Sequence, residues 1–283
     1  MGALDGRVAV VTGASRGIGA EIARRFAGEG ARVAVSARTT EAGQSQFEGT
    51  IHETVQSIVD AGGAAVAIAA NLARPEDRAG LIAETERELG PVDVLVNNGA
   101  VTWFEPVESF AENHYRMMFE VQVRAPFELT QLVLAGMRQR RWGAILNISS
   151  KGAIHPAGPP YGQQSGGGAV YGMVKAALER FTTGLAAEVH ADNVRVNVLS
   201  PTSIVPTPGV VHHQLLTPER EHLVEPVEVM AAAALALVTD PPGLTGRVAY
   251  SQQLLWELGL GPEPLAELLV TEHPRIGGPL VEQ

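Results

Sequence analysis

The sequence has no cysteine, which excludes a disulfide, a thiolate nucleophile and a zinc–thiolate site. It also has no apolar run that approaches the length needed to cross a bilayer. Residues 1–11, MGALDGRVAVV, lack the basic start, the long apolar region and the cleavage site of a signal peptide. We therefore expect a cytoplasmic protein without a membrane partner.

Positive charge is scarce as well. The net charge is −10 over 283 residues, and the longest basic run is the RQRR of residues 138–141. A negative protein opposes binding to phosphate polymers, and a short basic run at the expected end of a helix stabilises the helix dipole. No nucleic-acid partner is expected. A metal site is not expected either, because the adjacent imidazoles of His212 and His213 project differently and no local acidic ligand accompanies them.

Apolar residues make up 45% of the chain and charged residues 18%, which provides enough apolar surface for a compact core. Short β-branched runs alternate with amphipathic stretches typical of helices. The runs begin at residues 7, 32, 65, 92, 144, 194 and 247. Near-continuous apolar strands imply a sheet covered on both faces, and the alternation implies parallel pairing. The pattern predicts an α/β, Rossmann-like, doubly wound parallel sheet of about seven strands with helices on both faces.

A glycine-rich segment, TGASRGIG at residues 12–19, follows the first predicted strand and opens a predicted helix. In this context glycine permits a tight turn and a close backbone approach, while the amides at the helix start favour a pyrophosphate. A glycine turn without a ligand is the alternative. The segment predicts a dinucleotide site made by Gly13, Ser15, Arg16, Gly17, Ile18 and Gly19.

The end of the second predicted strand indicates which dinucleotide binds. An NAD-dependent protein carries an acidic residue there to accept hydrogen bonds from the free ribose hydroxyls. This chain has Ala37, followed by Arg38, and Arg16 lies in the glycine turn. Two guanidinium groups can pair with a ribose phosphate, although both could be ordinary surface arginines. We therefore expect NADP(H), with NAD(H) as the less favoured cofactor.

Tyr171 and Lys175 are four residues apart in an amphipathic helix, so their polar ends can reach one cavity. The apolar stripe of this helix comprises Val174, Leu178, Phe181, Leu185 and Val189. A phenol has a pKa of about 10, and a cation about 4 Å away in an effective dielectric of roughly 20 contributes about 4 kcal/mol. That energy corresponds to about three pKa units. The spacing predicts a tyrosine acid whose pKa is lowered by a lysine.

The two motifs, together with LVNNGA at 95–100 and NISS at 147–150, resemble the classical short-chain dehydrogenase/reductase family from about Arg7 to Val248. The resemblance implies an oxidoreductase in which Ser150 binds the substrate oxygen, Tyr171 is the acid and Lys175 also binds the nicotinamide ribose. It implies further cofactor contacts from Asn71, Leu72, Asn98, Gly99, Pro201 and Ile204.

The chain departs from the family pattern in three places. It reads Gly99-Ala100 where the family has alanine before glycine, and Thr202 replaces the usual glycine after Pro201. Gln122 occupies the position of the family's catalytic asparagine. Its amide could still order a relay water as a fourth catalytic residue, or it could be a residue of the helix surface. We expect this change to slow the reaction at worst.

The segment after the sixth strand resembles the family's variable substrate loop, which implies substrate contacts there. Five apolar residues in it indicate a substrate with a hydrophobic body: Val205, Val210, Val211, Leu215 and Leu216. His212 and His213 lie in the same loop. Residues 156–168 are rich in proline and glycine and make the spacing from Ser150 to Tyr171 roughly eight residues longer than the family's. Loops of this kind are either functional lids or disordered, and we favour a lid over the substrate entrance.

The chain has no internal repeat and no interdomain linker, so we expect one dinucleotide-binding and catalytic domain over residues 1–283. Its core is expected over about 7–250, with a C-terminal extension over about 251–283 that can pack on its own site or on a neighbour. The family commonly forms homotetramers or dimers, which we expect here. The leading function is NADPH-dependent reduction of a ketone to a secondary alcohol. A 3-oxoacyl thioester reductase and a catalytically weakened cofactor-binding regulatory protein are the alternatives.

Overall fold

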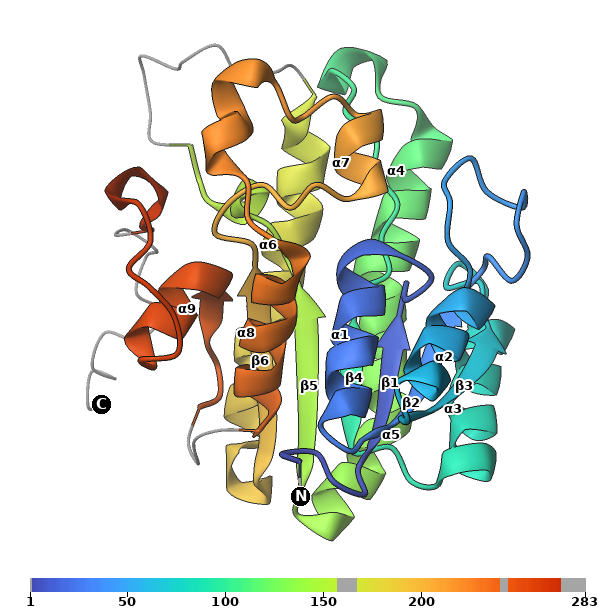
Figure 1. Cartoon of the computed structure of the whole chain (residues 1–283). Helices are drawn as coiled ribbons and strands as arrows, with labels where there is room; N and C mark the ends of the chain where they lie inside the picture. Colours follow the sequence, from blue (N-terminus) through green and yellow to red (C-terminus); the bar gives the residue numbers. More distant parts are fainter. Residues whose placement is uncertain (1, 157–166, 240–243, 271–283) are drawn as a thin grey trace, which may run out of the picture.

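The computed structural model describes residues 2–156, 167–239 and 244–270, and it contains a seven-stranded parallel sheet in the order β3-β2-β1-β4-β5-β6-β7 (Figure 1). The strands are β1 (Val8–Thr12), β2 (Arg32–Ala37), β3 (Ala64–Ala69), β4 (Val94–Asn97), β5 (Gly143–Ile148), β6 (Val194–Ser200) and β7 (Val248–Tyr250). Each coincides with a predicted apolar run. The predicted doubly wound parallel sheet is confirmed.

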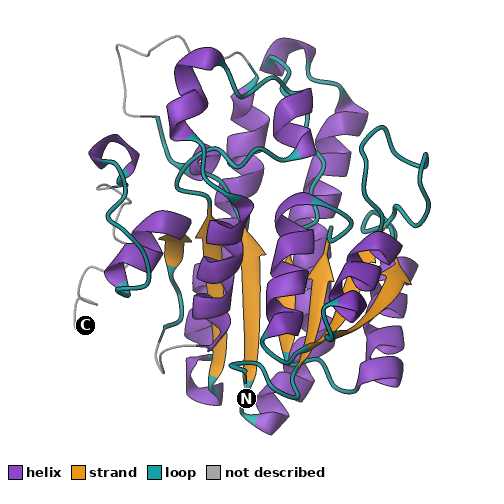
Figure 2. Ribbon diagram, viewed as in Figure 1, coloured by secondary structure: helices purple, strands orange, loops and turns teal. Residues whose placement is uncertain are grey.

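Helices cover both faces of the sheet (Figure 2). They are α1 (Gly17–Gly28), α2 (Ile51–Asp60), α3 (Pro75–Leu89), α4 (Glu112–Phe119), α5 (Ala125–Arg140), α6 (Gly168–Glu188), α7 (Pro208–His212), α8 (Val227–Thr239) and α9 (Ser251–Glu257). One apolar core packs α1, α2 and α8 on the sheet, and a second packs α3, α5 and α6 on the other face. None of the helices in these described ranges is long and apolar enough to span a membrane.

Two cores explain why the central strands are apolar along their whole length. All side chains of β1, β4 and β5 are buried, because alternate residues face opposite cores. The chain order reverses between β1 and β4, which pair in parallel from Ala9 opposite Val94. Loops from neighbouring strands diverge at such a point and leave a crevice outside the carboxyl ends. The glycine turn and the segment after β4 both lie at this crevice.

The amphipathic helix predicted around Tyr171 is α6, which begins at Gly168 and ends at Glu188. Val174, Leu178 and Leu185 of its predicted stripe are buried. The predicted basic run closes α5, where Arg141 caps the helix in the left-handed conformation with φ 52°. The predicted lid over residues 156–168 lies mostly outside the described residues. Of that segment the structure places Pro156 before the gap and, after it, Gly167, which caps α6, and Gly168, its first residue.

Candidate active site

A cleft of about 1770 Å³ opens at the carboxyl ends of the strands. Its walls include the glycine turn, the end of β5, the start of α6 and the loop after β6. Small-molecule sites usually occupy roughly 300–1,000 Å³, so this cleft has room for a dinucleotide and a second molecule. The cleft therefore joins the two motifs that are far apart in the sequence.

The glycine turn packs tightly against the end of β4. Gly13 has φ +66°, and a Cβ atom there would lie 2.7 Å from the Cα atom of Gly99. A Cβ atom on Gly19 would lie 2.6 Å from the carbonyl oxygen of Gly13. Gly17 has φ +56°, a conformation that L side chains rarely adopt. The three glycines are thus required by the shape of the turn itself.

Asn98 locks this turn in place. Its side-chain amide donates to the carbonyl oxygens of Thr12 at 2.9 Å and Gly13 at 3.2 Å. The Thr12 hydroxyl accepts from the backbone amides of Asn98 at 3.0 Å and Gly99 at 3.1 Å. A Cβ atom on Gly99 would meet Leu72 Cδ1 at 2.6 Å. Alanine at position 99, as in the family's order, would therefore require the Leu72 side chain to shift.

Arg16 and Arg38 lie on the same wall of the cleft. Burial and, after it, the charge of Arg38 lower the pKa of the Arg16 guanidinium. The Arg16 side chain is fixed by the loop before α2: it donates to the carbonyl oxygens of Glu48 at 2.7 Å and Gly49 at 2.8 Å. Two neighbouring guanidinium groups repel one another unless an anion lies between them. The wall is therefore suited to a phosphate group.

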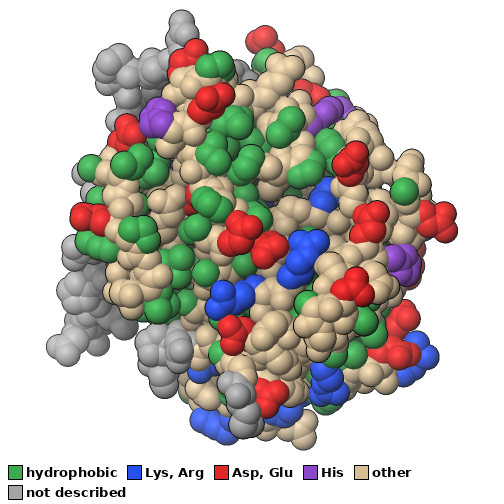
Figure 3. All heavy atoms as spheres, in the orientation of Figure 1, with side chains coloured by type: hydrophobic (Ala, Val, Ile, Leu, Met, Phe, Trp, Pro, Cys, Tyr) green, Lys and Arg blue, Asp and Glu red, His purple; other side chains and the backbone are tan. Residues whose placement is uncertain are grey.

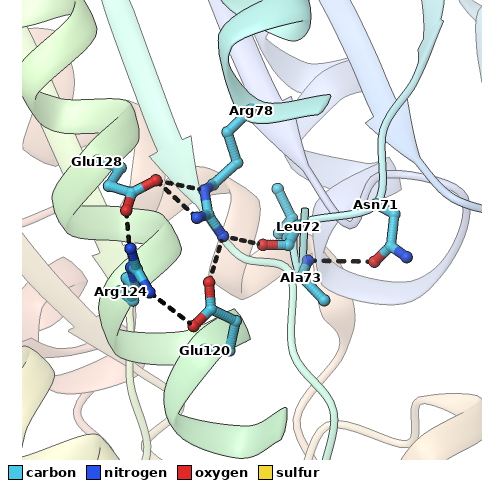
Figure 4. Close-up of polar contacts among 7 residues, drawn as sticks. All are labelled: Asn71, Leu72, Ala73, Arg78, Glu120, Arg124 and Glu128. Atoms are coloured by element: carbon cyan, nitrogen blue, oxygen red, sulfur yellow. Dashed lines mark hydrogen bonds and ion pairs between the residues drawn. The ribbon is translucent and has the colours of Figure 1, made fainter. Parts of the chain in front are cut away.

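An ion-pair network supports the other side of the nucleotide cleft (Figure 4). The fully buried Arg78 of α3 pairs with Glu120 at 2.8 Å and with Glu128 at 2.6 Å. Its guanidinium also donates to the carbonyl oxygen of Leu72 at 2.5 Å. Leu72 and Asn71, the predicted adenine contacts, both line the cleft. Arg78 therefore ties the predicted adenine loop to the helices behind it.

Replacing Arg78 by methionine is expected to lower the free energy of unfolding by about 3 kcal/mol, because Glu120 and Glu128 lose their shared partner inside the protein. Urea unfolding followed by circular dichroism measures this change. The control is Arg87→Met on the same helix, since Arg87 pairs with Glu84 and Glu88 at the surface and should cost less than about 1 kcal/mol. Equal losses in the two variants would contradict a supporting role for Arg78.

The predicted catalytic residues meet on the opposite wall. Ser150 follows β5, its hydroxyl accepts from the amide of Gly152 at 3.1 Å, and it hydrogen-bonds the Tyr171 phenol. Burial raises the pKa of Tyr171, and the bond with Ser150 opposes that rise. The sequence argument predicts the opposite direction. The difference arises because burial removes the hydration that a phenolate needs, while the Lys175 ammonium is directed to another acceptor.

That acceptor is the carbonyl oxygen of Ile148, to which Lys175 Nζ donates at 3.0 Å. The ammonium lies 5.8 Å from the centre of the Tyr171 ring. Burial lowers the pKa of Lys175 to about 8, and the neighbouring Glu179 opposes this shift. Glu179 is buried one turn further along α6 and accepts from the Ser149 hydroxyl at 2.7 Å. Burial raises the pKa of Glu179 to about 6.

Gln122 lies in η2 (Glu120–Arg124), a turn of π-helix between α4 and α5. Its side chain is buried and donates to the carbonyl oxygen of Val101 at 2.7 Å. The alternative of a helix-surface residue is therefore wrong. Val101 follows the Asn98 segment and lines the cleft, so Gln122 joins the π-turn to that wall. π-Turns of this kind are frequent at functional sites.

Pro201 and Ile204 line the cleft, as predicted for cofactor contacts. The contacts of Thr202 explain why threonine replaces the usual glycine at this position. Its side chain is fully buried and accepts from the amide of Gln252 at 2.9 Å. Its own amide donates to the Ser251 hydroxyl at 2.9 Å. Ser251 also donates to Glu225 at 2.6 Å. Thr202 and Glu225 thus anchor the loop after β6 to the start of α9. Sequence reasoning missed Glu225, because no motif surrounds it.

Apolar and aromatic residues surround the remainder of the cleft. Val205, Val210 and Leu215 of the predicted substrate loop line it, whereas Val211 is exposed to solvent. Apolar side chains gather over the upper part of the molecule in Figure 3, where Figure 1 places α7. The Phe104 ring lies 5.3 Å from that of Tyr171. The site thus contains an apolar region beside the predicted acid.

His213 packs edge-on against Phe104, with ring centres 5.2 Å apart. Burial, followed by the charge of His212, lowers the pKa of His213. His212 turns toward Phe47 instead, at a ring-centre distance of 5.3 Å. Within the described ranges no group of three or more histidine, aspartate or glutamate residues could hold a metal ion.

Fold and site together define a dinucleotide-binding oxidoreductase. The family model for short chain dehydrogenases matches residues 7–214. An uncharacterised oxidoreductase of Methylorubrum extorquens is 34% identical over 263 residues, covering 92% of this chain and 96% of the relative. The 3-oxoacyl-(acyl-carrier-protein) reductase of Vibrio cholerae is 34% identical over 199 residues, covering 70% and 73%. The chain belongs to the short-chain dehydrogenase family.

Solved structures agree with this assignment. A metagenomic short-chain oxidoreductase in complex with NADP is 30% identical, with a TM-score of 0.69 over 85% of this chain and 94% of that one. A 3-oxoacyl (acyl-carrier-protein) reductase from Agrobacterium tumefaciens with NADP bound is 28% identical, with a TM-score of 0.75 over 87% and 93%. Both similarities extend over most of each chain, so the nucleotide cleft lies within the shared fold.

Proposed function

We propose that the protein uses NADPH to reduce a ketone to a secondary alcohol, reversibly, in a single dinucleotide-binding and catalytic domain. The observation that carries this proposal is the cleft, which brings Ser150, Tyr171 and Lys175 to the same cavity as the glycine turn. The glycines of the turn, which have no Cβ atom, and the neighbouring Arg16 and Arg38 fit a phosphorylated dinucleotide. NADPH supplies the hydride when it is bound.

Ser150 would hold the substrate oxygen by a hydrogen bond, beside the Tyr171 hydroxyl to which it is already bonded. Tyr171 would protonate that oxygen as the carbonyl carbon is reduced. Burial raises the pKa of Tyr171, so the phenol carries its proton at neutral pH, which is the state that reduction requires. The nearby Lys175 ammonium would then stabilise the phenolate and bind the nicotinamide ribose, as the family resemblance implies.

Gln122 would act as the fourth catalytic residue by ordering a relay water. Its amide nitrogen is held by the Val101 carbonyl, and its amide oxygen, also buried, has no hydrogen-bond partner among the described residues. A buried acceptor is costly to leave unpaired, so a water molecule there would relieve that cost. The π-turn places this amide behind the wall that carries Val101.

The substrate would have an apolar body and no positive charge. Val205, Val210 and Leu215 supply the apolar surface. The described residues that line the cleft include no aspartate or glutamate, although the whole chain has a net charge of −10. An ammonium group on the substrate would therefore find Lys151, Lys175 and Arg220 but no carboxylate partner. Neutral or anionic ketones fit this surface.

A 3-oxoacyl thioester reductase is a second candidate, supported by the similarity to two proteins of that name from Vibrio cholerae and Agrobacterium tumefaciens. The test for both is the loss of NADPH absorbance with a panel that contains neutral ketones, oxo acids and a 3-oxoacyl thioester. We expect turnover of neutral apolar ketones. NADPH binding without turnover of any member would contradict the proposal and favour a regulatory cofactor-binding protein.

Glu179 offers a test of the role of Lys175. Its carboxylate opposes the lowering of the Lys175 pKa, so Glu179→Gln is expected to move that pKa below about 8. Lysine is charged below its pKa, so the alkaline limb of the profile of kcat/KM against pH should shift to lower pH. Glu188→Gln, at the exposed end of α6, is the control. An unchanged alkaline limb would show that the charge of Lys175 does not limit the reaction.

We also propose a homo-oligomer, a tetramer or a dimer. Exposed apolar side chains lie on two successive helices, with Tyr115 on α4 and Phe127 and Leu132 on α5. An exposed apolar patch of this kind commonly marks a protein interface. Sedimentation of the native protein measures the number of subunits. A cytoplasmic location stays a prediction from the sequence.

A further inference from the structure

The C-terminal extension returns to the active-site cleft. After α9 the chain forms the short turn η6 (Ala266–Leu268), drawn in dark red above α9 in Figure 1. Leu268 is buried and lines the cleft together with Ser150 and Tyr171. The sequence shows that the extension is apolar but gives no indication of where it packs.

Lys151, the residue directly after Ser150, holds this turn. Its ammonium donates to the carbonyl oxygen of Leu268 at 2.7 Å. A hydrogen bond from a charged donor is roughly twice as strong as a neutral one. Burial lowers the pKa of Lys151, and the nearby buried carboxylate of Glu225 opposes this shift. The anchor therefore combines a charged donor with a nearby buried carboxylate.

Two further contacts fix the same segment. The amide of Val270 donates to the side chain of Gln253 on α9 at 3.3 Å. Glu267 lies 3.4 Å from His222, which belongs to the loop after β6. The segment is thus joined to α9 and to two parts of the chain that line the cleft, the end of β5 and the loop after β6.

We propose that residues 266–270 form a wall of the substrate pocket, that Leu268 selects substrates by size, and that Lys151 holds this wall in place. The selectivity part of this inference rests on the proposed ketone reduction. Leu268 contributes an apolar surface on the side of Ser150, so a longer apolar substituent on the ketone would meet it. Lys151 is a positioning residue, since its contact is with the segment.

Substitutions of Leu268 test the selectivity. With methyl ketones of increasing chain length, Leu268→Ala should raise kcat/KM for long ketones relative to short ones by about tenfold, because a missing methylene in an apolar pocket changes the ratio by at least about that factor. Leu268→Phe should change the ratio in the opposite direction. Leu265→Ala is the control, because Leu265 is 52% exposed and does not line the cleft. The same ratio in all four proteins would overturn the role of Leu268.

The absence of cysteine allows a second test that needs no turnover. In Leu268→Cys the only thiol lies at the wall, and iodoacetamide should alkylate it slowly in the folded protein. Adding K151M should increase that rate severalfold, and K151R should keep it slow. Leu265→Cys should react with iodoacetamide at the same rate whether position 151 is lysine or methionine. Equal rates at position 268 with K151M and with Lys151 would overturn the anchor, whereas failure of every ketone would overturn only the proposed reaction.

Discussion

Replacing Tyr171 by phenylalanine is expected to lower kcat for ketone reduction by about 10²–10⁴-fold, the usual contribution of a positioned general acid. The hydroxyl is the only group removed, and it is the group that hydrogen-bonds Ser150. The ring itself should stay, because it packs against Phe104 and against the backbone of Gly152. The measurement is the steady-state rate of NADPH loss with a saturating ketone.

NADPH affinity separates the loss of the acid from a loss of structure. Titration of NADPH fluorescence should give a dissociation constant within about twofold of wild type, because less than about 0.5 kcal/mol of binding is expected to depend on the phenol. Tyr115→Phe, on the exposed side of α4, is the matched control and should keep full kcat. A Tyr171→Phe enzyme with undiminished kcat would remove Tyr171 from the acid role.

The fold was predictable because a parallel sheet with two cores leaves a direct signal in the sequence. Strands β1, β4 and β5 are buried on both faces, so they read as unbroken apolar runs. Only their exact ends differ: the run at 92 becomes a strand that begins at Val94. A short-range sequence pattern is therefore enough to predict a strand whose residues are all buried.

The site was predictable where residues form a local motif. Tyr171 and Lys175 share one helix, and the glycine turn is continuous, so spacing alone placed them. Arg78, Glu179 and Glu225 were not predictable, because their partners lie on other elements: Arg78 meets a glutamate 50 positions away. The direction of the Tyr171 pKa was missed for a related reason. The spacing indicates only roughly how far the phenol lies from the ammonium. It indicates neither the burial of the phenol nor that the ammonium donates to the carbonyl oxygen of Ile148.

The proposed preference for NADPH should reverse in Arg38→Asp. Loss of a charged hydrogen-bond donor costs about 1.5–3 kcal/mol, and the new carboxylate would repel a ribose phosphate while accepting from the free hydroxyls of NADH. We expect the ratio of the dissociation constants for NADPH and NADH to rise by about 1,000-fold, measured by fluorescence titration. Arg38→Leu separates the lost attraction from the new acceptor and should give a smaller rise.

Arg38 is a cleaner position for this test than Arg16. The Arg16 guanidinium also holds the loop before α2 through the carbonyl oxygens of Glu48 and Gly49, so its removal would disturb that wall. Arg38 is exposed and follows directly after the end of β2 at Ala37. Arg24→Asp, on the outer side of α1 beside Glu21, is the charge-matched control and should leave the ratio unchanged. If Arg38→Asp and Arg24→Asp gave the same ratio, the phosphate would have to be recognised elsewhere in the cleft.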